Sequence, residues 1–262
     1  VCHRCNARTP YATTCPSCGS HRVRAFGLGT EGLETRVVER WPQAQVMRWD
    51  QDVARSHAAH TTIMSAFVRG EVDILVGTQM IARGLDVPKV TVVGVISADT
   101  ALNLPDFRAT EWTFQLLAQV AGRAGRGLLG GKAFLQTYHP DHYAVRYAAE
   151  HDYEGFAERE LAFRRRTGYP PAIRLARLVT SHTDSGKAQA AAEHLASILR
   201  HALAREGLPE TDLIGPAPAY FARVRGRTRW QLLLRSVDPA AFLRKVEMPR
   251  HWQVDIDPVS VL

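Results

Sequence analysis

The sequence has no long apolar run. Of its 262 residues, 45% are hydrophobic and 23% are charged, and no stretch is both apolar and long enough to cross a bilayer. No charged segment leads into an apolar one after Val1, as a secretory signal peptide would require. Internal repeats and low-complexity tracts are missing too. These absences argue against a membrane role and predict a cytoplasmic protein built from ordinary globular domains.

Acidic residues are fewer than basic ones. The 26 Asp and Glu against 33 Lys and Arg give a formal net charge of +7, and the isoelectric point is near 9.5. Such a charge favours polyanionic partners, because each neutralised phosphate releases condensed counterions. Many basic proteins bind no nucleic acid, so charge alone leaves the question open.

The middle of the chain, from Val23 to Tyr138, alternates short apolar runs with helix-like segments. Strands that are continuously apolar and alternate with helices indicate a parallel sheet covered on both faces, which predicts an α/β fold. The expected strands are Val46 to Trp49, Asp73 to Val76, Val90 to Ile96 and Lys132 to Gln136, and the expected helices are Gly32 to Trp41, His57 to Val68 and Thr110 to Ala124.

The last third has a different element order. A charged helix is expected from Tyr153 to Thr167, and Pro170-Pro171 then forbids helix continuation and marks a boundary. The order beyond it is β-α-β-β-α-β, a split βαβ or ferredoxin-like α+β pattern. Its expected elements are Leu175 to Ser181, Gly186 to Glu206, Asp212 to Gly215, Thr228 to Arg235, Pro239 to Val246 and Trp252 to Asp257.

The four cysteines all lie near the start of the chain, in two Cys-x-x-Cys pairs. Cys2 and Cys5 form the first pair, and Cys15 and Cys18 form the second after nine intervening residues. Each such turn presents two thiolates on one side of the backbone, and Gly19 relaxes the second turn, which suits tetrahedral zinc. Disulfides or a redox pair are the alternatives. Because the chain opens inside such a pair, we expect it to be part of a longer protein.

The most informative stretch runs from Gln119 to Gly127 and reads QVAGRAGRG. Arg123 and Arg126 are three residues apart, and glycines such as Gly122 let the backbone approach a ligand closely. Guanidinium groups so placed can neutralise the charge that develops on a transferred phosphoryl group. Standing alone, the pair would equally suit a solvated basic turn.

A second candidate stretch follows the strand that ends at Val76. Gly77-Thr78 at the carboxyl end of a parallel strand, opening a helix, would present free backbone N–H groups to a phosphate. Asp86, two residues after Gly84, could accept hydrogen bonds from a ribose. Alone, Gly77-Thr78 would more simply cap a helix.

Together these stretches resemble motifs V and VI of superfamily 2 helicases, and specifically the PriA family of primosomal proteins, which restart stalled replication forks. The resemblance extends over the whole chain. It is carried by Gly27 to Glu31, Arg48-x-Asp50, Gly77 to Gly84, Pro105 to Glu111, Gln119 to Gly127, Tyr169-Pro170-Pro171, Gly215-Pro216 and Asp255 to Pro258.

The resemblance implies a motor of two RecA-like lobes that binds ATP with Mg²⁺ between them and translocates 3′ to 5′ on DNA. In this chain it assigns Arg123 and Arg126 to the ATP phosphates, with Arg126 as the arginine finger, and Gln119 to the coupling of nucleotide state to lobe closure. Gly84, Asp86 and Gly122 fall at the nucleotide, and Thr78 and Gln79 nearer the DNA backbone. Leu85 and Val87 depart from the family, which has a histidine and an aromatic residue there.

The resemblance also implies a zinc module of eight cysteines and two Zn²⁺ ions, of which only the second half is present. By the family's nested pairing, Cys2 and Cys5 serve one ion and Cys15 and Cys18 the other. The chain has no Gly-x-x-x-x-Gly-Lys-Ser/Thr and no Asp-Glu-x-His, which belong to the first lobe. We therefore expect no ATP hydrolysis by this chain alone.

Four arginines alternate near the end: Arg223, Arg225, Arg227 and Arg229. In an extended segment they would share one face, and with Tyr220, Phe221 and Trp230 they could bind DNA; a solvated strand edge is the equal alternative. In the resembled family this domain contacts branched DNA and the tail of single-stranded DNA-binding protein, beside other primosome proteins.

The expected domains are a partial zinc module (1–22), the second helicase lobe (23–150) and a DNA- and partner-binding domain (151–262), in a monomer. We expect the arginine pair and the Gly77-Thr78 turn to converge on one edge of a single parallel sheet. Two other classes remain open: a non-catalytic scaffold that has lost ATP chemistry, and a related RNA-directed helicase.

Overall fold

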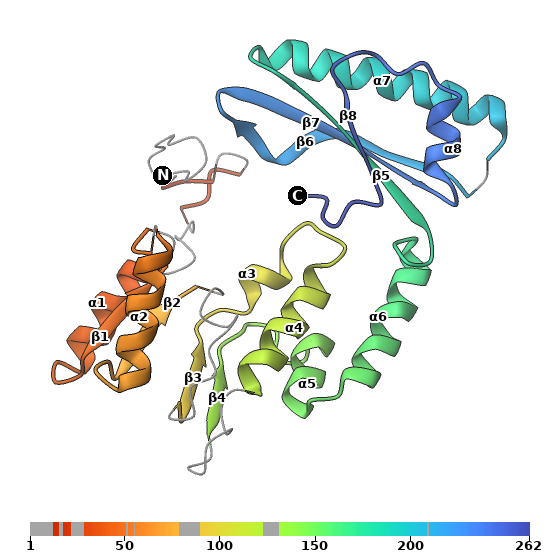
Figure 1. Cartoon of the computed structure of the whole chain (residues 1–262). Coiled ribbons are helices and arrows are strands. Elements are labelled where there is room, and N and C mark those ends of the chain that lie inside the picture. Colours follow the sequence, from red (N-terminus) through yellow and green to blue (C-terminus); the bar gives the residue numbers. More distant parts are fainter. Residues whose placement is uncertain are drawn as a thin grey trace. The chain divides into compact units, whose positions relative to one another are not determined.

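The chain forms two compact units (Figure 1). The N-terminal unit contains the described residues of Ala12–Asn103 and Thr110–Tyr153, and the C-terminal unit contains Leu104–Ala109 and Glu154–Leu262. No helix among the described residues is long and apolar enough to cross a membrane. The computed structural model describes residues 13–15, 18–21, 29–50, 52–54, 56–78, 90–122, 131–208 and 210–262.

A parallel strand pair opens the N-terminal unit. Strand β1 (Val46–Trp49) pairs with β2 (Ile74–Gly77), and helices α1 (Thr30–Arg40) and α2 (His57–Arg69) precede and follow β1, as the alternation of apolar runs predicts. The α2 helix has strong local signals at both ends. Its N-cap Ser56 accepts a hydrogen bond from the Ala59 N–H at 3.2 Å, and its C-cap Gly70 is left-handed with φ 81°. The core of this part consists of Trp49, Ala54 and Ile63, with Met47, Met64, Phe67 and Leu75 packed against it.

A second parallel pair follows in the same unit. Strand β3 (Val92–Val95) pairs with β4 (Lys132–Leu135), and helices α3 (Asp99–Leu102), α4 (Ala109–Ala121) and α5 (Tyr143–Glu150) complete this part. The expectation of one continuous parallel sheet is therefore wrong for the described residues, which form two separate two-stranded sheets. The burial of β3 agrees with this, because Val92 is 61% exposed and does not lie in a central, doubly covered strand.

The C-terminal unit contains a four-stranded antiparallel sheet in the order β6-β7-β5-β8. Its elements follow α6 (Tyr153–Thr167) in the order β-α-β-β-α-β that the sequence predicts. They are β5 (Arg174–His182), α7 (Ser185–Glu206), β6 (Asp212–Val224), β7 (Arg227–Ser236), α8 (Pro239–Arg244) and β8 (Gln253–Ile256).

Helices α7 and α8 pack on one face of this sheet (Figure 1). Strand residues that alternate toward that face are fully buried, as Leu178 and Leu232 are, and they meet Leu195 and Leu199 of α7. Burial of one such leucine stabilises the fold by about 1.5–3 kcal/mol. This well-packed core holds the long β6–β7 hairpin in place.

Strand β6 extends to Val224, well past the predicted end at Gly215. Its Pro216 and Pro218 argue locally against a strand, but β6 is an edge strand, and proline is tolerated at an edge because one side of the strand needs no donors. The ladder is irregular. Between the pairs Pro218–Trp230 and Arg223–Thr228, β6 has four residues, 219–222, where β7 has only Arg229. We call residues 219–222 the aromatic bulge.

The segment Leu104–Ala109, which we call the Asp106 loop, belongs to the C-terminal unit although it lies between α3 and α4 in sequence. The Asp106 carboxylate accepts hydrogen bonds from the Ser260 hydroxyl and the Val261 N–H, both at 2.7 Å, and from the Arg108 N–H at 2.8 Å. Each of its oxygens is therefore used, and residues far apart in sequence are joined at one carboxylate.

Aromatic and guanidinium groups pack around the same loop. The Phe107 ring stacks on Tyr169, with centroids 5.8 Å apart and an interplanar angle of 3°. The Arg164 guanidinium lies 5.5 Å from the Phe107 centroid, and Arg235 lies equally far from that of Tyr169. Arg164 also pairs at 2.7 Å with Glu160, and both residues are buried. The Asp106 loop is thus integral to the C-terminal unit.

Candidate functional site

The first candidate edge lies where β1 and β2 end. Trp49 pairs with Gly77, so Asp50 and Thr78, the next residues of two parallel strands, follow at the same edge of the sheet. Thr78 is exposed there, as its predicted role requires. The N-terminus of α1 reaches the same edge, because Thr30 donates a hydrogen bond to Asp50 at 2.5 Å. Carboxyl edges of parallel strands that meet a helix N-terminus suit phosphate-bearing ligands.

Asp50 is the central group at this edge and is only 5% exposed. Its second oxygen accepts hydrogen bonds from the Asp52 and Val53 N–H groups, each at 3.0 Å. The Arg48 Nε lies 3.2 Å from the carboxylate but is not oriented for a hydrogen bond, so that contact is ionic. These contacts fix the start of α1 to the end of β1.

The environment of Asp50 favours its charged form. Burial raises the pKa of its carboxyl, but the hydrogen bonds from Thr30 and from the Val53 backbone, together with the charge of Arg48, outweigh burial and leave the pKa below its ordinary value. Asp50 is therefore an ionised structural anchor at neutral pH. Since its oxygens are already occupied, its role is to position α1 and β1.

A similar carboxylate lies at the edge where β3 and β4 end. Asp99, 4% exposed, accepts hydrogen bonds from the Thr137 hydroxyl at 2.9 Å and from the Tyr138 N–H at 3.1 Å. It therefore ties the start of α3 to the segment that leaves β4. No motif in the sequence points to Asp99, because its partners Thr137 and Tyr138 lie far away along the chain.

The α4 helix presents the predicted motif VI residues at its C-terminal end. Gln119 is half-buried there, and the Gly122 N–H donates to the Ala118 carbonyl at 2.9 Å. A Cβ at Gly122 would lie 3.2 Å from that carbonyl oxygen, so a larger residue would crowd the helix end. Spacing of three along a helix puts Gln119 and Gly122 on one side of α4, immediately before Arg123.

Several predicted site residues lie outside the described residues, and their assignments stay predictions. These undescribed residues are Cys2, Cys5, Gln79, Gly84, Asp86, Arg123 and Arg126. Among the described residues, the structure brings together Gln119 and Gly122, and separately Thr78 and Asp50. It gives no test of whether the arginine pair shares an edge with Thr78.

The second cysteine pair lies in a tight turn. Gly19 is left-handed with φ 68°, as expected, and its N–H donates to the Cys15 carbonyl at 2.8 Å, while the Cys15 N–H donates to the Ser20 carbonyl at 2.9 Å. Of the two described cysteines, neither Cys15 nor Cys18 forms a disulfide. A turn closed by such bonds, with two thiols three residues apart, fits half of a zinc knuckle. Within the described residues, no group of three or more metal-ligating side chains is present.

The basic segment near the end of the chain is a hairpin, so the prediction that its arginines share one face of an extended strand is wrong. The chain reverses at Arg225 and Gly226, whose φ angles of 49° and 77° identify a two-residue type I′ loop. The four arginines are therefore distributed over β6 (Arg223), the loop (Arg225) and β7 (Arg227 and Arg229). The alternation of arginines did not predict the hairpin, because the Arg-Gly pair at its turn lacks the asparagine that usually marks this loop.

The hairpin arginines also differ in what they contact. Arg227 donates to the hydroxyl and to the carbonyl of Ser181, at 3.1 and 2.7 Å, which fixes β7 to β5. Burial, and then the like charge of Arg229, lower the pKa of Arg177 on the neighbouring strand. Arg225 is exposed and holds a left-handed conformation that costs a non-glycine residue roughly 1–2 kcal/mol. A residue kept in a strained conformation at an exposed loop is a candidate for function.

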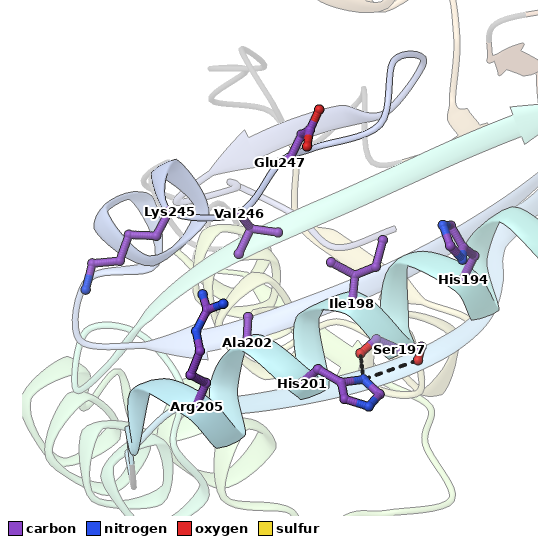
Figure 2. Close-up of a pocket in the computed structure, with 9 residues that line it drawn as sticks. All are labelled: His194, Ser197, Ile198, His201, Ala202, Arg205, Lys245, Val246 and Glu247. Carbon is purple, nitrogen blue, oxygen red and sulfur yellow. Dashed lines mark hydrogen bonds between the residues drawn. The ribbon is translucent and has the colours of Figure 1, made fainter.

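A groove of about 480 Å³ in the C-terminal unit contains none of the predicted site residues. It lies between α7 and the segment after α8, where Ile198 and Val246 point into it (Figure 2). Two of its polar groups have partners within the unit: His201 contacts the Ser197 carbonyl at 2.7 Å, and Lys245 pairs with Glu206 at 2.6 Å. The groove is therefore no evidence for the predicted chemistry.

Comparisons with known proteins place these features in a family. The helicase conserved C-terminal domain matches residues 21–127, and the primosomal protein N C-terminal domain matches residues 165–259. The whole chain is 42% identical to the replication restart protein PriA of Bacillus subtilis, and 39% identical to that of Treponema pallidum. It covers 32% and 40% of those proteins, so it spans roughly a third of the relatives' length. The chain belongs to the PriA family of replication restart proteins and corresponds to a C-terminal portion of its members.

Proposed function

We propose that this chain is the C-terminal part of an ATP-dependent 3′→5′ DNA helicase that recognises stalled or branched replication forks and restarts replication through primosome assembly. The observation that carries the proposal is the end of α4, where Gln119 and Gly122 lead directly into Arg123, inside the region matched by the helicase C-terminal domain. The name of the relatives, replication restart protein, supports the biological setting.

The residues of this chain have different roles in the proposed motor. ATP with Mg²⁺ supplies the transferable phosphoryl group when bound between two lobes. Arg126, as the arginine finger, and Arg123 neutralise the charge that develops on that group, while Gln119 couples their position to lobe closure. Gly84, Asp86 and Gly122 lie at the nucleotide. Thr78, exposed at the end of β2, and Gln79 hold the DNA backbone.

The missing half of the motor gives the proposal a direct test. The chain has no phosphate-binding Gly-x-x-x-x-Gly-Lys-Ser/Thr loop, so purified chain should show no ATP turnover above background with forked DNA. A chimera should behave differently, in which the chain replaces the matching region of the Bacillus subtilis relative. That chimera should hydrolyse ATP in a DNA-dependent manner and unwind forked DNA, and Arg126→Ala should reduce turnover by about 10³-fold or more.

The matched control in this experiment is Arg250→Ala, which changes an exposed arginine of the C-terminal unit. Its turnover should equal that of the unmodified chimera. DNA-dependent turnover that survives Arg126→Ala would remove the arginine finger from the proposal, and a folded chimera without any turnover would reject the motor function itself.

The ligands and partners follow from the same proposal. Cys15 and Cys18 hold one Zn²⁺ ion together with cysteines upstream of the chain, and Cys2 and Cys5 contribute to a second. The C-terminal unit, whose strand order β6-β7-β5-β8 supports the ferredoxin-like assignment, contacts branched DNA and the tail of single-stranded DNA-binding protein. Substitution of Cys15 and Cys18 by serine in the chimera should release about one zinc ion per chain, measurable by metal analysis.

A further inference from the structure

The aromatic bulge of β6 places a ring at the surface. Ala219 is 2% exposed and anchors the bulge, whereas the next residue, Tyr220, is 49% exposed. Tyr220 contacts Phe221 edge to face, with centroids 4.9 Å apart and an interplanar angle of 75°. Because the bulge removes these residues from the regular ladder, the exposed Tyr220 ring is not needed to pair the two strands.

Basic side chains flank this ring on the same hairpin. Arg223 and Arg225 are exposed and have no hydrogen-bond or ion-pair partner within the described part of the chain. Arg229 is the one β7 residue that faces the bulge, and it lies near the like charge of Arg177. Arg227 is different, because both of its contacts are to Ser181. Unpaired cations between an exposed ring and the tip of the same hairpin are complementary to a chain that alternates bases with phosphates.

We propose that the aromatic bulge, with Arg223 and Arg225, is a binding site for single-stranded nucleic acid. One unpaired base stacks on the exposed face of Tyr220, and Arg223 and Arg225 contact successive phosphates where the strand continues from that base toward the tip of the hairpin. Arg229 adds positive charge behind the bulge, where a phosphate relieves its repulsion with Arg177. Arg227 maintains the hairpin and does not contact the ligand.

One observation favours a single strand over a duplex, and a second favours a functional role for the guanidinium at the loop. The exposed group at the centre of the site is an aromatic ring, which stacks on the face of an unpaired base, whereas bases in a duplex are already stacked on each other. The second is Arg225 itself. Asparagine or glycine would adopt its left-handed conformation with less strain, so the guanidinium is present at the loop at the expense of local stability.

This inference deepens the proposed contact of the C-terminal unit with DNA, but it does not depend on ATP hydrolysis and is tested on the chain by itself. The probe is a fluorescent oligothymidylate about 15 nucleotides long, followed by anisotropy. Tyr220→Ala should weaken binding about 5- to 150-fold, the effect expected for loss of one stacked base, whereas Tyr220→Phe should keep affinity within about twofold. Tyr138→Ala, an exposed tyrosine of the other unit, is the matched control and should leave affinity unchanged.

Arg225→Asn separates binding from folding. It should lower affinity and reduce the slope of log K against log salt by about 0.7, the share of one phosphate contact, while the melting temperature stays equal or rises. Arg250→Asn should change neither. If oligouridylate binds as tightly as oligothymidylate, the site accepts both RNA and DNA. If oligothymidylate binds more tightly, the site is one for DNA. The proposal is overturned if Tyr220→Ala and Arg225→Asn both bind the oligothymidylate like the unmodified chain. It is also overturned if a blunt duplex binds as tightly as the oligothymidylate and Tyr220→Ala weakens the binding of neither. Loss of turnover in the chimera would leave this result untouched.

Discussion

Replacing Asp50 by asparagine keeps the shape of the side chain but removes the charge on which the edge of β1 and β2 depends. The carboxylate accepts on both oxygens, one from Thr30 and the other from two backbone N–H groups, and it lies 3.2 Å from Arg48. An amide has only one acceptor oxygen. If that oxygen keeps the backbone bonds, the NH₂ group must face the Arg48 cation.

The magnitude follows from burial. A hydrogen bond to a charged group contributes about 1.5–3 kcal/mol, and breaking a fully buried ion pair costs about 3–5 kcal/mol. Arg48 is not left alone, because its side chain is 20% exposed and Glu34 lies 3.7 Å away. We therefore expect Asp50→Asn to reduce the free energy of unfolding by about 2–3 kcal/mol at neutral pH.

The pH dependence gives the sharper test. Since the folded-state pKa of Asp50 lies below its unfolded value of about 3.9, its contribution is complete above that pH and is lost as the pH falls through the folded-state pKa. In urea unfolding, the difference in the free energy of unfolding between the unmodified chain and Asp50→Asn should be constant from about pH 5 to 7. It should shrink towards pH 3. A difference that is equally large at pH 3, or is absent at pH 7, would refute the assigned role of the charge.

Substitutions at three further places test the buried ion pair, a crowded glycine and a helix cap. Arg164→Ala should destabilise the C-terminal unit by about 3–5 kcal/mol in urea unfolding. Methionine at both Glu160 and Arg164 should cost much less stability, because no buried charge is left unpaired. Equal losses of stability in the two variants would contradict this reasoning. Gly215→Ala should cost about 1–3 kcal/mol in the melting curve, since φ is 100° and the new Cβ would lie 3.0 Å from the Gln231 carbonyl oxygen. Ser56→Ala should cost about 1 kcal/mol through loss of the α2 cap, and Ser56→Thr should restore most of it.

Local sequence signals predicted most of the secondary structure. A short apolar run placed β1 at its observed ends, and a charged helical stretch before Pro170-Pro171 did the same for α6. The caps Ser56 and Gly70 of α2 show why such boundaries can be predicted. The element order of the C-terminal unit followed for the same reason. In contrast, Pro216 and Pro218 concealed the length of β6, because whether a strand lies at an edge is decided by pairing and not by its own residues.

Sheet connectivity and the buried carboxylates could not be predicted from local pattern. Which parallel strands pair depends on contacts between distant segments, so two separate sheets and one continuous sheet give the same sequence alternation. Asp50 and Asp99 each follow an apolar strand, and only Asp50 was singled out, as part of the Arg48-x-Asp50 motif of the resembled family. Their partners Thr30 and Thr137 are 20 and 38 residues away, and no periodicity carries information over that separation.

The Asp106 loop limits how this polypeptide can be divided. A cut between Tyr153 and Glu154 would appear to release a complete C-terminal module, yet Leu104–Ala109 would stay behind on the other fragment. The excised piece would lose the ring that covers Tyr169 and the carboxylate that holds Val261. Module exchange between relatives therefore requires two crossovers or the transfer of both units, and residues around Phe107 are expected to have evolved together with those around Tyr169.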